Sequence, residues 1–146
     1  MLLSELLLET EHSVTRNKPF SKDELERIEM LLGKLEAKGI KDISAKVLGF
    51  AGEMSYREMR EKIGFLRNKA YKKEFVTIDQ IYAQDQDGVS VTNLRSVLEA
   101  WDKAPLPEVL KIPGGYWLIE GHHRIALQRL AGRHKIQIFT EYEKKR

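Results

Sequence analysis

The chain has 146 residues, of which 42% are hydrophobic and 32% charged, with a formal net charge of +3 and a pI of about 9.0. This length and composition can bury a core, and the lack of cysteine excludes a disulfide, a thiolate metal site and a cysteine nucleophile. The basic excess alone does not indicate an obligate nucleic-acid-binding protein, and without a long apolar stretch or basic leader we expect a cytoplasmic protein without membrane association.

Residues 1–73 are predicted to form a helical N-terminal segment. Residues 1–9 have the pattern of a short amphipathic helix, and a Ser-x-x-Glu capping box at Ser21 predicts a helix over residues 21–38. Gly39 can adopt the left-handed conformation that ends such a helix. The apolar stripe of this helix consists of Leu25, Ile28, Leu32 and Leu35.

Two further helices are expected before residue 74. Residues 42–51 suggest a short helix, and a capping box of Ser55 with Glu58 predicts a longer one that ends near residue 72. The stripe of the longer helix consists of Tyr56, Met59, Ile63, Leu66 and Ala70. The two long stripes could bind a second copy or a helical partner, or they could pack on each other and on the rest of the chain.

Strands and helices alternate in residues 74–146, which we expect to form a second unit. The expected elements are a strand at 75–78, a turn at 85–88, a helix at 92–102 capped by Thr92 or Asn93, a hairpin of strands 109–112 and 116–119, a helix at 122–131 and a strand at 135–142. Trp101 and Trp117 are expected in the core. The predicted fold class is therefore α+β, a small mixed sheet with a helical N-terminal extension.

The junction Glu120-Gly121-His122-His123-Arg124 has the pattern of an anion site. A strand leads into it and a helix leaves it, so the first backbone N–H groups of that helix lack internal acceptors and carry partial positive charge. Gly121 lets the backbone turn sharply, and Arg124 can bind a phosphate with two parallel N–H groups or pair with Glu120. Either histidine could donate to phosphate or carry a proton, and Glu120 could orient a histidine, accept from a sugar hydroxyl or help hold Mg²⁺.

This stretch resembles the ParB/sulfiredoxin superfamily, and more narrowly its ParB-like branch with an Asp-Gly-His-His-Arg motif. The similar residues run from Tyr116 to Ala126 and close with Leu130-Ala131-Gly132. Upstream, Ile78-Asp79-Gln80-Ile81 resembles the opening strand and loop of the family, and residues 85–89 resemble a Thr-Gln-x-x-Val element of that branch. The resemblance covers residues 74–143 and implies a nucleotide-binding domain.

The members of this superfamily imply several chemistries. Sulfiredoxins bind ATP and use a cysteine, where His122 stands here, so sulfinic acid reduction is excluded. Partition ParB proteins bind CTP through Gly-Glu-Arg-Arg, of which Gly121 and Arg124 match, and then clamp DNA. A free-serine kinase branch shares Gly121 to Arg124, with Glu120 in place of its Asp, and some members are described as nucleases, for which the catalytic candidates would be His122, His123 and Glu120.

A basic run in the expected second helix is the candidate for nucleic-acid contact, although a solvated helix face is the commoner meaning of such a run. Its members are Arg57, Arg60, Arg67, Lys69, Lys72 and Lys73. Gln86 could contact a base or phosphate, or be only a turn residue.

Together these features predict a ParB-like protein that binds a nucleoside triphosphate, ATP or CTP with Mg²⁺, and acts in DNA binding or DNA transactions. The first alternative is an enzyme of the same fold, either a nuclease or a nucleotide-dependent phosphotransferase. The second is a non-catalytic interaction module, which would use the helical stripes to form a homodimer or bind a helical partner.

Overall fold

In the computed structural model the chain folds as an α+β protein, and the structure describes residues 16–84 and 88–145. The helix expected over residues 1–9 and the candidate residue Gln86 lie outside these ranges. The elements are, in chain order, α2 (Lys22–Ala37), β1 (Asp42–Ile43), α3 (Ala45–Leu48), β2 (Gly52–Glu53), α4 (Tyr56–Ile63), β3 (Lys69–Thr77), β4 (Ile81–Ala83), β5 (Val89–Ser90), α5 (Val91–Glu99), β6 (Glu108–Ile112), β7 (Gly115–Glu120), α6 (His122–Leu130) and β8 (Lys135–Glu143).

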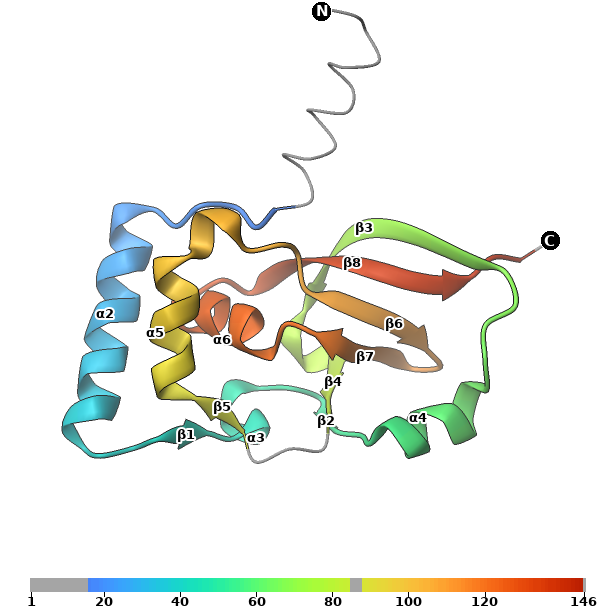
Figure 1. The fold of residues 1–146 in the computed structure, drawn as a ribbon, viewed down its shortest axis with the longest axis horizontal. Coiled ribbons are helices and arrows are strands. Elements are labelled where there is room, and N and C mark those ends of the chain that lie inside the picture. The colour runs from blue at the N-terminus through green and yellow to red at the C-terminus, as the bar shows by residue number, and fades with distance from the viewer. Residues whose placement is uncertain (1–15, 85–87, 146) are drawn as a thin grey trace, which may run out of the picture.

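A mixed six-stranded sheet with the order β2-β4-β7-β6-β8-β3 organises these elements. Helices α2, α5 and α6 gather at one end of the molecule, and the long strands β3 and β8 run toward the other end, where α4 also lies (Figure 1). Strands β1 and β5 form a separate two-stranded antiparallel ribbon. Strand β7 lies between β4 and β6, so the junction that follows it starts from the interior of the sheet.

The apolar side chains of the sheet form two clusters. The larger cluster joins α2, α5 and α6 to the sheet, and Ile136, Ile138 and Thr140 of β8 are fully buried on that side, as their alternation predicts. The smaller cluster includes Met59 of α4 and Trp117 of β7. Trp101 and Trp117 are both buried, which confirms the prediction for them.

Helix α2 matches its prediction closely. Both hydrogen bonds of the capping box between Ser21 and Glu24 form, and Ile28 and Leu32 are fully buried in the larger cluster. Met59, Ile63 and Leu66 of the second stripe belong to the smaller cluster, so the two stripes do not pack on each other. Leu25 of the first stripe and Tyr56 of the second are exposed, which corrects the prediction for these two residues. No helix in the described residues is long and apolar enough to cross a membrane.

The helical interpretation of residues 1–73 is wrong in two places. The longer helix ends at Ile63, because Gly64 turns the chain with a φ of 63°, and residues 69–77 form β3, which pairs with β8 along its whole length. Leu66 and Ala70 fit helical spacing, but the long antiparallel pairing overrides that local preference. Residue 74, the expected boundary between the two units, lies within β3.

The short helix predicted over residues 42–51 is also shorter than expected. It covers only Ala45–Leu48, after the two residues of β1, and Gly49 ends it with a φ of 97°. Val47 of this helix is 76% exposed. In the second half, α5 begins at Val91 and its cap is Ser90, whose side chain accepts from the N–H of Asn93, so the predicted cap was two or three residues too late.

Candidate functional site

The turn between β7 and α6 depends on Gly121. Its φ of 116° and ψ of 27° lie in the left-handed region, which residues other than glycine rarely adopt. A Cβ built there would lie 2.9 Å from the Cβ of Pro107 and 3.1 Å from Nη2 of Arg124. The backbone therefore approaches its neighbours closely at this point, and the next residue, His122, begins the helix.

The first turn of α6 has no capping side chain. The N-cap is a glycine, so the N-cap residue cannot accept a hydrogen bond through a side chain, and the first-turn N–H groups cannot reach an acceptor inside the helix. No acidic residue lies in this first turn to offset the partial positive charge of the helix end. The helix start that the sequence predicts is present, and anion binding by it stays a prediction.

A cleft of about 620 Å³ lies against this helix start. Residues 120–124 form one wall, and the end of α5 with the segment that follows it forms another. Lys103 of that segment supplies a cation, and Val97 and Ile119 supply apolar surface. The sequence does not identify Gln84, Val97 and Lys103 as site residues, because nothing in their local pattern shows that the fold places them beside α6.

Arg124 is anchored by the protein itself. Its Nη1 donates to the carbonyl oxygens of Pro105, at 2.8 Å, and Leu106, at 3.2 Å. Partial burial lowers the pKa of Arg124, while the nearby carboxylates of Glu120 and Glu108 act in the opposite direction. Among the described residues Arg124 forms no ion pair with Glu120, so the alternative in which those two side chains lock the turn is not what the structure shows.

Both histidines accept hydrogen bonds from the backbone. Nε2 of His122 accepts from the N–H of Gln84, and Nε2 of His123 accepts from the N–H of Ser90, each at 3.1 Å. Burial, with a smaller contribution from His123, lowers the pKa of His122 to about 4, and burial also lowers the pKa of His123. Both rings are therefore neutral near pH 7, with the proton on Nδ1.

The histidines thus connect the start of α6 to both ends of the segment from Gln84 to Ser90. Gln84 is held further by its side-chain amide, which donates to the carbonyl oxygens of Leu118 and Ile119 at 3.1 and 2.9 Å. These contacts keep the chain on each side of Gln86 near the cleft, although Gln86 itself lies outside the described residues.

Glu120 is the carboxylate at the cleft wall. It is exposed, and in the sheet it lies directly opposite Glu108 of β6. Among the described residues no group of three His, Cys, Asp or Glu side chains could hold a metal ion. A magnesium ion at Glu120 would therefore need oxygen ligands from a bound phosphate and from water, which is how Mg²⁺ is usually held beside nucleotides.

The basic run is not on one helix face, which corrects the sequence interpretation. Arg57 and Arg60 lie on α4, Arg67 lies in the loop that follows it, and Lys69, Lys72 and Lys73 lie on β3. Along β3, alternation directs Lys69 and Lys73 to one face and Lys72 to the other. Several of these cations also have partners, since Arg57 pairs with Glu61 and Lys69 with Glu141.

A scan against protein-family models found no match for the chain, and a search of curated proteins found no similar protein. The resemblance to the ParB/sulfiredoxin superfamily therefore stays a prediction that depends on the motif at residues 116–126.

Proposed function

We propose that this protein binds a nucleoside triphosphate at the first turn of α6 and acts in DNA binding or DNA transactions. One observation supports nucleotide binding. A helix start without a capping side chain faces a cleft of about 620 Å³ whose walls include Arg124 and Lys103. Unpaired N–H groups, a helix dipole and two cations in one concave site are the features that bind phosphate groups in proteins.

The contacts of Arg124 favour a preorganised phosphate site. Because Pro105 and Leu106 hold Nη1, the side chain keeps its place without a ligand, and Nε and Nη2 still have donor capacity for phosphate oxygens. A guanidinium that is already ordered loses little side-chain entropy when it binds. The neutral histidines would act as Nδ1–H donors and not as cations, since Nε2 of each ring already accepts a hydrogen bond.

The rest of the cleft suits a nucleoside. Its volume falls within the range of about 300–1,000 Å³ that small-molecule sites occupy. Val97, Ala100 and Ile119 supply apolar surface for a base, and the side chain of Gln84 supplies a polar group beside them. These residues fit ATP and CTP alike, and Glu120 would be the residue that helps to hold a magnesium ion, whose charge would offset that of the phosphates.

A second candidate is an enzyme at the same site, either a nuclease or a nucleotide-dependent phosphotransferase. The exposure of Glu120, with Glu108 opposite it in the sheet, favours this candidate, because two carboxylates near phosphate oxygens can bind a catalytic Mg²⁺. In such an enzyme Nδ1–H of His122 or His123 would donate a hydrogen bond to the phosphate, and a ring could take up a proton only at Nε2, after the backbone N–H bonded there had moved away.

A thermal-shift titration with ATP, CTP, GTP and UTP, each with and without Mg²⁺, tests the binding proposal. A ligand at 100 times its Kd adds about 2.7 kcal/mol of stability, which for a chain of this size corresponds to a rise in Tm of roughly 5–10 °C. Arg124→Ala should remove most of that rise. Arg57→Ala is the matched control, because Arg57 is an exposed arginine on α4 that does not line the cleft.

Calorimetric titration of the same variants measures nucleotide binding directly, so a loss of binding can be distinguished from a loss of stability in Arg124→Ala. Arg124→Lys is a milder change at the same position. Wild-type protein that shows no shift and no heat with any of the four nucleotides at millimolar concentration would refute the proposal. Release of inorganic phosphate that disappears in His123→Gln, with binding retained, would identify the enzyme of the second candidate.

A further inference from the structure

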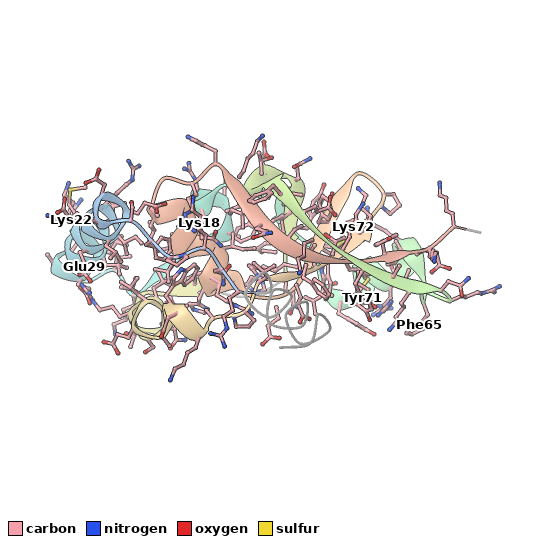
Figure 2. All side chains as sticks on the ribbon, turned by 90° about the horizontal axis from the view of Figure 1, so that it is seen from above. Lys18, Lys22, Glu29, Phe65, Tyr71 and Lys72 are labelled. Atoms are coloured by element: carbon pink, nitrogen blue, oxygen red, sulfur yellow. The ribbon has the colours of Figure 1, made fainter. Side chains whose placement is uncertain are left out.

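A second cleft, of about 660 Å³, lies away from α6 between the loop that follows α4 and the end of β8. Phe65 and Lys72 line it, and both lie in the half of the molecule opposite to Lys22 and Glu29 of α2 (Figure 2). It shares no lining residue with the cleft at α6. Whatever binds here would therefore be distinct from the nucleotide proposed above.

Positive charge dominates this second cleft. Its lining includes four cations, Arg67, Lys72, Lys111 and Lys145, and one carboxylate, Glu143. Both oxygens of Glu143 accept hydrogen bonds from the backbone, one from the N–H of Arg67 at 2.9 Å and the other from the N–H of Asn68 at 3.3 Å. The carboxylate therefore fixes the loop that carries Arg67, and the cations remain in excess.

Two of the lysines lie over aromatic rings. Nζ of Lys72 is 5.0 Å from the ring centre of Tyr142, and Nζ of Lys111 is 4.6 Å from that of Tyr116. Lys111 also donates to the carbonyl oxygen of Gly115, and Lys72 lies 3.8 Å from Glu74. Cation–π contacts position an ammonium group without cancelling its charge, so Lys111 can still attract an anion, whereas Lys72 shares its charge with Glu74.

Phe65 offers an exposed aromatic face at the same cleft. It is 78% exposed, which is unusual for a phenylalanine, and the guanidinium of Arg60 lies 4.6 Å from its ring centre. Arg60 is fixed in turn, since it donates to the hydroxyl of Tyr56 and to the carbonyl oxygen of Gly64. The arginine orients the phenyl ring, so the ring is ready for a flat group to stack on it.

We propose that this second cleft binds single-stranded nucleic acid, with one base stacked on Phe65 and the neighbouring phosphates bound by the four cations. An exposed, oriented aromatic ring in a cleft with several cations is the combination that proteins use for unpaired strands. A duplex presents no base face to such a ring. This proposal depends on the second cleft alone and does not require nucleotide binding at α6.

Fluorescence anisotropy of the full chain with a labelled oligothymidylate of about 15 nucleotides tests the proposal. Stacking on an aromatic ring is worth about 1–3 kcal/mol per base, so Phe65→Ala should weaken binding by roughly 5- to 150-fold. Phe75→Ala is the matched control, because Phe75 is a 63% exposed phenylalanine of β3 that does not line this cleft.

The cations are tested by salt dependence. Arg67→Gln and Lys145→Gln should each weaken binding and lower the slope of log K against log salt by about 0.7. Lys22→Gln, at the far end of the molecule, should leave both unchanged (Figure 2). Arg124→Lys should also keep strand binding, which separates this proposal from the proposal for the cleft at α6.

Three outcomes would overturn the inference. One is an absence of strand binding at 50 mM salt in the full chain, and another is equal weakening by Phe65→Ala and Phe75→Ala. The third is self-association through Phe65 without strand binding, measured by sedimentation, which would make the surface an interface between two copies of this chain.

Discussion

Acidification should destabilise the protein through His122. Burial lowers the pKa of this ring to about 4 in the folded state, against an ordinary value of 6.5, and Nε2 accepts from the N–H of Gln84. The unfolded chain therefore binds a proton at a higher pH than the folded chain does. The stabilisation is fully present above pH 6.5 and is lost as the pH falls toward 4.

The size of the effect follows from the two pKa values. The full shift would cost about 2 kcal/mol of unfolding free energy between pH 7.5 and pH 5.0, and because the ring is only partly buried we expect about 1 kcal/mol. His123, whose pKa is also lowered by burial, acts in the same direction. The loss is large enough to measure against a total stability of about 5–15 kcal/mol.

Urea unfolding at pH 7.5, 6.5, 5.5 and 5.0 measures this loss. His122→Gln is the matched variant, because its amide oxygen can replace Nε2 as the acceptor for Gln84 but does not titrate in this range. Its stability should fall less with pH than that of the wild type, by about 1 kcal/mol at pH 5.0. Parallel profiles for the two proteins would refute the reasoning, as would a His122 pKa near 6.5 measured by NMR.

Two further predictions concern the turn and an ion pair. Gly121→Ala should lower the free energy of unfolding in urea by roughly 1–3 kcal/mol, because the φ of Gly121 is 116° and a Cβ would lie 2.9 Å from Pro107. The control is Gly33→Ala in α2, where no atom lies within 4 Å of the new Cβ. It should leave the free energy of unfolding unchanged or raise it by up to about 1 kcal/mol. In Arg133→Ala, the pKa of Glu24, which its hydrogen bond from Arg133 holds at about 2, should rise toward 4.5 in an NMR titration; an unchanged pKa would contradict that cause.

Local signals in the sequence predicted much of the fold. The capping boxes at Ser21 and Ser55 predicted where α2 and α4 begin, because their hydrogen bonds form between residues three apart. The Pro113-Gly114-Gly115 turn predicted the hairpin of β6 and β7 for the same reason, with Gly114 at a φ of 83°. Each of these features is decided within a few residues, so the sequence alone contains it.

The sequence predictions were wrong where contacts between distant residues determine the structure. Residues 64–73 have helical spacing of apolar side chains, yet residues 69–77 form β3, because they pair with residues of β8 that lie 58 to 74 positions later. The cleft beside α6 is also formed by residues that lie far apart in the sequence. The sequence identified the wall from Glu120 to Arg124, but Gln84 and Lys103 reach the site only through the sheet and through α5.

By itself the sequence determined a glycine turn followed by a helix start with two histidines and an arginine. Only the tertiary structure decided what those side chains contact. Each histidine accepts from a backbone N–H and Arg124 donates to two carbonyl groups, in each case across at least 18 positions of the chain. The physical reason is that helix caps and turns form within a few residues, whereas hydrogen-bond partners, burial and the pKa values that follow from them depend on how the whole chain packs.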